Sequence, residues 1–283
     1  MKFITFYDHD QRLRAGVKTD RGIVDISGKY TIHEVISGGR DVLREVEAYA
    51  AGADDVLDEK DLTYGPCVTD PQKIICVGLN YRKHAEETNA PIPEVPILFN
   101  KFNNTLTGHG HDVVLPRVSQ AVDYEAELVI VIGKSAKDVT EEEALDYVFG
   151  YCNVNDLSAR DLQMRTPQWM LGKICDGFSP LGPYLVTADE VGDPNQLDIR
   201  CIVNGETRQH SNTADMIFTC KEIISYISRH LTLLPGDLIL TGTPEGVVLG
   251  LPEAERIYLK DGDLVTIEIE KLGALTNRMV AER

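Results

Sequence analysis

The chain is short of positive charge and has no long apolar run. Its 283 residues include 28 Lys and Arg against 45 Asp and Glu, a net charge of −17 at pH 7. Because nucleic-acid binding depends on Lys and Arg that neutralise phosphates, this balance argues against a nucleic-acid partner. The longest apolar run, Leu128–Ile132, is far shorter than the ~20 residues of a membrane-spanning helix. We therefore expect no membrane partner.

Several sequence signatures are also missing. The six cysteines include no CxxC pair, which predicts reduced, mostly buried thiols and a cytoplasmic location. The first twelve residues have no apolar stretch before their charges, so no secretory signal is expected. Neither G-x-G-x-x-G nor G-x-x-x-x-G-K-[ST] occurs, which removes the main signal of the nucleotide-binding folds.

Strand-like segments outnumber helical ones, which predicts a β-rich α+β fold and not a doubly wound sheet. A polar stretch rich in Asp ends at Asp70-Pro71 and predicts a boundary. We expect a small N-terminal α+β domain over residues 1–68 and a larger domain over residues 69–283. The clearest strand predictions are 2–7, 23–26, 74–78, 128–132, 151–155, 237–241 and 264–269.

Two Thr-x-x-Glu sequences have the form of a capping box, which satisfies backbone donors at the start of a helix. Thr31–Glu34 predicts a short helix in the N-terminal domain, and Thr140–Glu143 predicts a helix that continues to about Phe149. Residues 41–51 have amphipathic spacing, and residues 81–88 form a short helical segment bounded by prolines.

Alternating carboxylates at Asp123, Glu125 and Glu127 run directly into an apolar strand. Side chains at i, i+2 and i+4 share one face of a strand, so we expect all three to point the same way. Carboxylates this close repel one another and need a compensating cation. Asp156 follows another strand, and carboxylates alone suit Mg²⁺ or Mn²⁺, with Ca²⁺ as a third candidate. From these residues alone, a solvated acidic strand edge is an equal alternative.

Five segments carry a family resemblance when they are taken in order. They are CVGLNYRKHAEE at 76–87, DYEAELVIVIG at 123–133, NVNDLSARD at 153–161, LGKICDGFSPLGP at 171–183 and LTGTPEGV at 240–247. Together they resemble the fumarylacetoacetate hydrolase family, and the resemblance extends from about residue 73 to the C-terminus. The N-terminal unit also looks like the small leading domain of longer bacterial members.

The resemblance implies a fold and a metal site. The fold is a mixed β-roll catalytic domain that forms a homodimer. The metal is a divalent cation held by an E-x-E pair and a downstream Asp, here Glu125, Glu127 and Asp156. Asp123 then lies outside the ligand set, as a neighbour of the ligands. The implied substrate is a small anionic 2-oxo acid.

The resemblance leaves the reaction open between two enzyme activities. We expect a metal-dependent hydrolase that cleaves a C–C bond in acylpyruvate or fumarylacetoacetate-type acids through a metal-stabilised pyruvate enolate. The alternative is a decarboxylase or isomerase of oxaloacetate or of acids like 2-hydroxyhepta-2,4-diene-1,7-dioate. A third hypothesis, a non-catalytic scaffold, predicts a broken site, whereas every expected group is present here.

The resemblance also assigns catalytic and substrate-binding residues. His84 and Glu87 share one face of the predicted 81–88 helix, and the family uses such a pair as a base and its orienting carboxylate. Without the resemblance, His84 would be taken as a surface histidine. Lys173 matches the family's active-site lysine. The residues expected to bind substrate are Arg160, Gln163 and Thr243, although Arg160 could instead pair with Asp161 as ordinary structure.

Three further features have weaker signals. His109-Gly110-His111 looks like a metal pair but has no evident third ligand. Lys101 lies where the family usually has Lys-Pro, but Phe102 follows it here. Because the net charge repels an anionic substrate, a local basic rim must attract it. The candidates for this rim are Arg82, Lys83, Arg160, Arg165 and Lys173.

Overall fold

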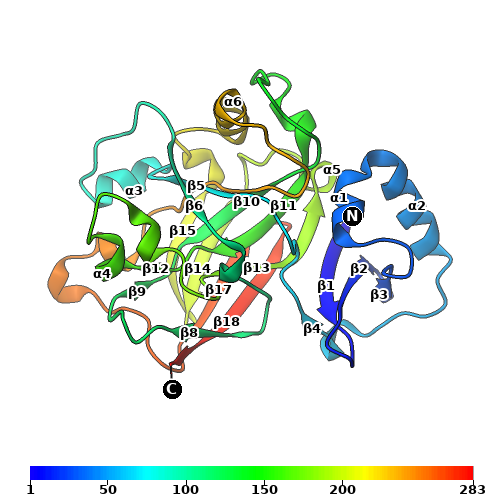
Figure 1. Cartoon of the computed structure of the whole chain (residues 1–283). Coiled ribbons are helices and arrows are strands. Elements are labelled where there is room, and N and C mark those ends of the chain that lie inside the picture. Colours follow the sequence, from blue (N-terminus) through cyan, green and yellow to red (C-terminus); the bar gives the residue numbers. More distant parts are fainter. Residues whose placement is uncertain (283) are drawn as a thin grey trace.

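A mixed sheet of eleven strands extends through the computed structural model, which describes residues 1–282 (Figure 1). Its strands are β1 (Lys2–Tyr7), β2 (Leu13–Thr19), β3 (Gly22–Asp25), β4 (Thr63–Tyr64), β5 (Ile74–Gly78), β6 (Ile97–Lys101), β7 (Leu106–Thr107), β10 (Ala126–Ile132), β11 (Val148–Asn155), β13 (Ser179–Thr187) and β16 (Leu238–Leu240). The order is β3-β2-β1-β13-β11-β10-β16-β5-β6, with β4 beside β1 and β7 beside β13.

A second sheet of five strands has the order β15-β14-β17-β18-β8. Its strands are β8 (Asp112–Leu115), β14 (Asp198–Val203), β15 (Glu206–Asn212), β17 (Leu264–Ile269) and β18 (Gly273–Ala281), and a separate pair is formed by β9 (Val122–Asp123) and β12 (Ser158–Ala159). The described residues thus form the expected strand-rich α+β fold.

The helices are short and lie around these sheets. The α-helices are α1 (Ile32–Ser37), α2 (Gly39–Ala51), α3 (Arg82–Glu87), α4 (Arg160–Gln163), α5 (Ala188–Val191) and α6 (Cys220–His230). The 3-10 turns are η1 (Glu59–Asp61), η2 (Asn103–Thr105), η3 (Ala144–Tyr147), η4 (Trp169–Gly172), η5 (Thr213–Asp215), η6 (Val248–Gly250) and η7 (Glu253–Glu255). None of these helices is long and apolar enough to cross a membrane.

Strand β10 is apolar along its length because the protein covers both of its faces. Leu128 and Ile130 belong to the core that includes the five-stranded sheet and α6, whereas Val129 and Val131 belong to the core that includes α1 and α2. All four side chains are fully buried. The apolar run of β10 therefore lies between two cores. The carboxylates just before this run lie at the N-terminal end of the strand.

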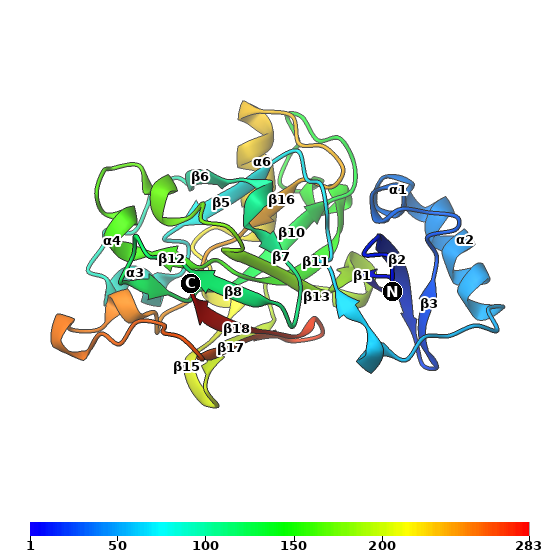
Figure 2. The ribbon, with the colours of Figure 1, turned by 60° about the horizontal axis from the view of Figure 1, so that its bottom comes forward.

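The N-terminal residues are joined to the larger part of the chain through the sheet. β1 pairs antiparallel with β13, with Phe3 opposite Leu185, so the sheet crosses the expected boundary. In both views α1 and α2 lie at one end of the molecule, and α3 and α4 lie at the other (Figures 1 and 2). The division between residues 68 and 69 stays a prediction.

Most of the predicted elements are confirmed. The predicted strands at 2–7, 23–26, 74–78, 128–132, 151–155, 237–241 and 264–269 correspond to β1, β3, β5, β10, β11, β16 and β17, and helices 41–51 and 81–88 to α2 and α3. The capping box at Thr31–Glu34 also forms, with the Glu34 amide donating to Thr31 Oγ1 at 3.2 Å.

The helix predicted after Thr140 is wrong. Only the four residues of η3 are helical, and β11 begins at Val148. The backbone amides of Gly133 and Lys134 both donate to the carbonyl of Tyr147, which ties this segment to the end of β10. The sheet contacts therefore outweigh the local helix signal. A second capping box, at Thr219–Glu222, was not predicted and begins α6.

The Thr-x-x-Glu sequences at 219–222 and 140–143 allow a matched test of capping. Thr219→Ala should lower the free energy of unfolding by about 1 kcal/mol, because α6 loses its cap. Thr140→Ala should change it by less than about 0.5 kcal/mol, because Thr140 caps no helix and is exposed. Urea denaturation monitored by circular dichroism measures both, and equal losses would contradict the assignment.

Candidate active site

A cavity of about 600 Å³ opens at the end of the molecule that carries α3 and α4. Eight of the nine residues expected to act in catalysis, substrate binding or metal binding line it: His84, Glu87, Glu125, Glu127, Arg160, Gln163, Lys173 and Thr243. The ninth, Asp156, is completely buried beneath its floor. Trp169 and Phe99 contribute aromatic wall, with their rings edge to face at 5.6 Å between centroids.

Three buried carboxylates meet at the floor of the cavity. Glu125 directly precedes β10, Glu127 is its second residue, and Asp156 directly follows the neighbouring strand β11. The Asp156 amide donates to the Glu125 carbonyl at 2.9 Å, which keeps the two strand ends together. One oxygen from each carboxylate lies within 4.8 Å of the others. The three residues named by the resemblance are therefore placed as a possible metal site.

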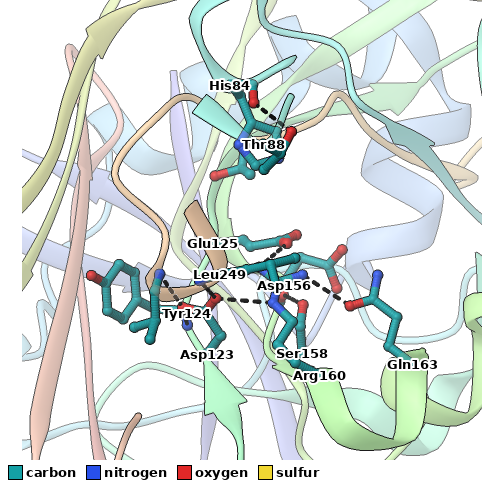
Figure 3. Close-up of polar contacts among 12 residues, drawn as sticks. His84, Thr88, Asp123, Tyr124, Glu125, Asp156, Ser158, Arg160, Gln163 and Leu249 are labelled. Carbon is teal, nitrogen blue, oxygen red and sulfur yellow. Dashed lines mark hydrogen bonds and ion pairs between the residues drawn. The ribbon is translucent and has the colours of Figure 1, made fainter. Parts of the chain in front are cut away.

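Asp123 does not belong to this group, so the expectation that three carboxylates share one strand face is wrong. β9 ends at Asp123 and β10 begins at Ala126, and the break turns the Asp123 side chain elsewhere. Its carboxylate accepts from the amides of Val248 and Leu249, each at 3.0 Å, and from Arg160 Nε at 2.9 Å (Figure 3). Asp123 thus ties α4 to the segment after β16.

Lysine and arginine neutralise one side of the cluster. Lys173 Nζ lies 2.7 Å from both Glu125 Oε2 and Asp156 Oδ2, and Arg160 Nη2 lies 2.7 Å from Glu125 Oε1. Burial favours a protonated Glu125, but Lys173 and Arg160 outweigh it and lower the pKa of Glu125 to about 2. Burial opposes a charged Lys173, but Asp156 and Glu125 raise its pKa above the usual range. Both groups are therefore charged at neutral pH.

Lys101 also belongs to the cluster, although its sequence signal was weak. Its side chain is buried, and Nζ pairs with Asp156 and donates to the Phe178 carbonyl at 2.8 Å. The missing proline after Lys101 therefore does not remove the lysine from the site. Lys101 and Asp156 are far apart in sequence, so only the pairing of strands across the sheet brings them together.

Glu127 has no positive partner among the described residues. Its carboxylate accepts from the Gly242 amide at 2.8 Å, and Gly242 adopts a φ of +96°, which favours glycine. Burial, followed by the charges of Asp156 and Glu125, raises the pKa of Glu127 well above its ordinary value. Four carboxylates, Asp123 included, face three cations here. A divalent cation fits this set because oxygen ligands and an excess negative charge suit a hard ion.

His84 and Glu87 form the expected pair on α3. His84 Nδ1 lies 2.7 Å from Glu87 Oε1, and the Gly246 amide donates to Glu87 Oε2 at 2.9 Å. A Cβ on Gly250 would lie 2.5 Å from the Glu87 carboxylate, so glycine allows this segment to pack over the pair. With Nδ1 held by Glu87, Nε2 is the ring nitrogen left to exchange protons in the cavity. Figure 3 places His84 and Thr88 across from Glu125 and Arg160.

The expected substrate-binding residues are held by polar contacts of their own. Arg160 Nη1 donates to Gln163 Oε1 at 3.0 Å, and Thr243 Oγ1 accepts from Gln209 Nε2 at 2.8 Å. Asp161 accepts a hydrogen bond from Ser119 Oγ at 2.6 Å, whereas Arg160 pairs with other carboxylates. The alternative in which Arg160 pairs with Asp161 as ordinary structure is therefore wrong.

The basic rim differs from the expected one. Arg82, Lys83 and Arg165 are exposed and do not line the cavity, whereas Arg256 lines it and was not predicted. No local motif surrounds Arg256, so the sequence alone carried no signal for it.

The two histidines at 109 and 111 form hydrogen bonds with backbone groups. His109 Nδ1 accepts from the Thr276 amide at 3.0 Å, and His111 Nε2 lies 2.6 Å from the Tyr64 carbonyl. Burial lowers the pKa of His109. These contacts explain the pair as structural.

A strand-rich α+β fold with a buried carboxylate cluster and a His–Glu pair at one cavity is the arrangement of an enzyme that acts on small molecules. Residues 73–280 match the family model described as fumarylacetoacetate (FAA) hydrolase C-terminal. The chain belongs to the fumarylacetoacetate hydrolase family.

Individual relatives cover nearly the whole chain. Oxaloacetate tautomerase fahd2, mitochondrial, of Xenopus laevis is 41% identical over 290 residues, which cover 99% of this chain and 90% of the relative. Among solved structures, a fumarylacetoacetate hydrolase from Exiguobacterium antarcticum has 35% identity and a TM-score of 0.84, with all of both chains covered. Maleylpyruvate hydrolase from Sphingobium sp. SYK-6, in complex with manganese and pyruvate, has 30% identity and a TM-score of 0.84, also with complete coverage of both.

The unpaired charge of Glu127 predicts an unusual stability effect. Without divalent metal, Glu127→Gln should raise the free energy of unfolding at pH 7 by about 1–3 kcal/mol, because the amide needs neither a buried charge nor the uptake of a proton on folding. With Mn²⁺ present, wild type should gain stability and the variant should not. Thermal unfolding measures both, with the exposed Glu94→Gln as control.

The pH dependence of stability follows from the same shift. A carboxyl whose folded pKa is raised binds its proton more tightly when folded, so metal-free stability falls as pH rises above the unfolded value of about 4.3. Glu127→Gln should remove this part of the decline. A variant that is less stable than wild type without metal at every pH would contradict the assignment of charge.

Proposed function

We propose that the protein is a divalent-metal-dependent tautomerase of oxaloacetate or a similar 2-oxo dicarboxylic acid. The observation that carries the proposal is His84, held at Nδ1 by Glu87, in the same cavity as the cluster of Glu125, Glu127 and Asp156. The name of the Xenopus laevis relative, at 41% identity over nearly the whole chain, supports it. Tautomerisation of oxaloacetate is one reaction within the decarboxylase or isomerase alternative that the resemblance left open.

The substrate would be bound at the floor of the cavity. A divalent cation held by Glu125, Glu127 and Asp156 would supply a Lewis acid for the carboxylate and the 2-oxo oxygen of the substrate. Lys173 keeps its positive charge beside this position and offsets negative charge that develops on oxygen. Gln163 and Thr243 line the same cavity and provide polar groups that can orient the substrate.

His84 would move the proton. Glu87 keeps the Nδ1 proton of His84 in place and stabilises the imidazolium, so Nε2 can accept the proton that leaves C3 of the keto form. The same nitrogen can then deliver the proton to the 2-oxygen, which gives the enol form. One C–H bond breaks and one O–H bond forms, and no water is consumed. The His84–Glu87 pair would therefore carry the proton transfer, while a cation held by the carboxylate cluster would polarise the 2-oxo group.

Hydrolysis of a C–C bond is the second candidate, as the sequence first suggested. It would use the same His84–Glu87 pair to activate a water molecule, and two solved relatives at 35% and 30% identity are named hydrolases. The relative named a tautomerase is more similar to this chain, and its reaction needs no bound water. We therefore place tautomerisation first.

The decisive experiment compares the two reactions on the same preparation. Freshly dissolved enol-oxaloacetate should be converted to the keto form faster than in the buffer control when Mg²⁺ or Mn²⁺ is present, as followed by loss of the enol absorbance. EDTA should abolish this acceleration and added metal should restore it. Acetylpyruvate and fumarylpyruvate should be cleaved with a much lower kcat/KM. Efficient cleavage without tautomerisation would overturn the proposal in favour of the hydrolase.

The proton-transfer role of His84 can be tested apart from metal binding. His84→Gln should lower kcat for tautomerisation by about 10²–10⁴-fold, the usual contribution of a general acid–base group. Mn²⁺ affinity, measured by calorimetry, should stay within about threefold, because His84 is not among the three carboxylates. Glu87→Gln should give a smaller loss, and a His84 variant that keeps most of its activity would contradict the role.

Three expectations remain predictions. They are the homodimer implied by the resemblance, the cytoplasmic location, and the boundary between residues 68 and 69. The proposed reaction takes place in one cavity, whose lining comes from residues 77–256 of a single chain.

A further inference from the structure

Three long cationic side chains line the cavity, and two of them are already neutralised. Lys173 pairs with Glu125 and Asp156, and Arg160 pairs with Asp123 and Glu125. The third, Arg256, forms no ion pair with any carboxylate of residues 1–282. The ion pairs in the cavity are formed by the other two cations, Arg160 and Lys173. A positive charge that faces a cavity without a protein partner is available to an anionic ligand.

Arg256 is held in place by the backbone around it. Its side chain is half-buried, and Nε donates to the Leu251 carbonyl at 2.9 Å. This contact leaves the two terminal nitrogens of the guanidinium as free donors. Residues 249–252, which precede it by a few positions, form part of the cavity wall. In the sequence this segment lies between β16 and β17, and in Figure 1 it is drawn in orange at the end of the molecule that carries α3 and α4.

The segment that carries Arg256 is fixed to the rest of the site at two points. Asp123 accepts from the amides of Val248 and Leu249, and the absence of a Cβ at Gly250 allows close packing on Glu87. The segment therefore packs against Glu87 of the His84–Glu87 pair and is also held beside Arg160 through Asp123. A ligand bound at the cluster and extending past His84 would meet this wall.

The surroundings favour recognition of a carboxylate at Arg256. Much of the wall is apolar, with Met164, Trp169, Leu249, Leu251 and Pro252. An apolar wall lowers the local dielectric and strengthens the attraction between opposite charges. The planar guanidinium fork also matches a carboxylate with two parallel hydrogen bonds. Because the whole protein carries a net charge of −17, a second carboxylate on the substrate needs such a local partner.

We propose that Arg256 binds the distal carboxylate of the substrate and selects dicarboxylates over acids with an uncharged distal end. The inference rests on the proposed function in one respect: it takes the ligand to be a 2-oxo or 2-hydroxy acid bound by its proximal end at the carboxylate cluster. It assigns to Arg256 a role in specificity that is separate from proton transfer at His84.

Two unreactive ligands of equal length test this assignment by binding. L-Malate and (S)-2-hydroxybutyrate share the 2-hydroxy carboxylate end and differ only in a distal carboxylate or methyl group. In calorimetry with saturating Mg²⁺, wild type should bind malate more tightly than 2-hydroxybutyrate. Arg256→Gln should lower the affinity for malate by about 10–100-fold, as expected for a lost charge-assisted hydrogen bond. Its affinity for 2-hydroxybutyrate should change by less than threefold, which also shows that the variant is folded.

Matched variants define the controls. Arg165→Gln removes an exposed arginine outside the cavity and should leave both affinities unchanged. Arg256→Lys keeps the charge without the fork and should recover part of the malate affinity. An Arg256→Gln variant that binds malate as wild type does would overturn the proposal. An equal loss for both ligands would overturn it as well, because Arg256 would then act on the whole cavity.

The two proposals fail in different ways. If wild type does not tautomerise oxaloacetate but prefers malate through Arg256, the reaction is wrong and the carboxylate subsite stands. If wild type tautomerises oxaloacetate and the Arg256→Gln variant keeps the same kcat/KM and malate affinity, the reaction stands and the subsite is wrong.

Discussion

The buried charge of Glu127 is the constraint on which the site depends. Lys101, Arg160 and Lys173 neutralise the carboxylates around it, but within residues 1–282 the one hydrogen-bond donor to the Glu127 carboxylate is the backbone amide of Gly242. A buried carboxylate without a positive partner is costly unless it is protonated or shares a cation. The fold tolerates this cost at one point, and that point is the floor of the cavity. The unmatched charge is thus the physical reason to place a divalent cation here.

The fold supplies the rigidity that such a cluster needs. β10 has a core on each face, so the carboxylates at its start cannot move without disturbing both cores. Asp123 connects α4 to the segment after β16, and Glu87 connects α3 to the same segment through Gly246. Charged side chains therefore join the walls of the cavity as well as lining it. Removing one of these carboxylates would loosen a wall in addition to changing the chemistry.

Functions within this family can diverge while the floor of the cavity stays the same. The carboxylate cluster and the His84–Glu87 pair would serve tautomerisation and hydrolysis alike, since both pass through loss or gain of a proton beside a polarised 2-oxo group. What differs between substrates is the distal end, which would meet the wall formed by residues 249–256. Selection among 2-oxo acids is therefore expected in this wall, with fold and floor in common.

Local periodicity and the family resemblance together indicated much of the site, and long-range contacts decided the rest. The strand period put Glu125 and Glu127 on one face and the helix period put His84 beside Glu87, whereas their roles as metal ligands and catalytic pair came from the family resemblance. The amide of Gly242 on Glu127 and the free charge of Arg256 in the cavity join segments that no short pattern connects. The helix signal at Thr140 failed because sheet contacts hold Tyr147. Residue spacing describes neighbours along the chain, whereas charge balance and cavity walls arise only when distant segments pack together.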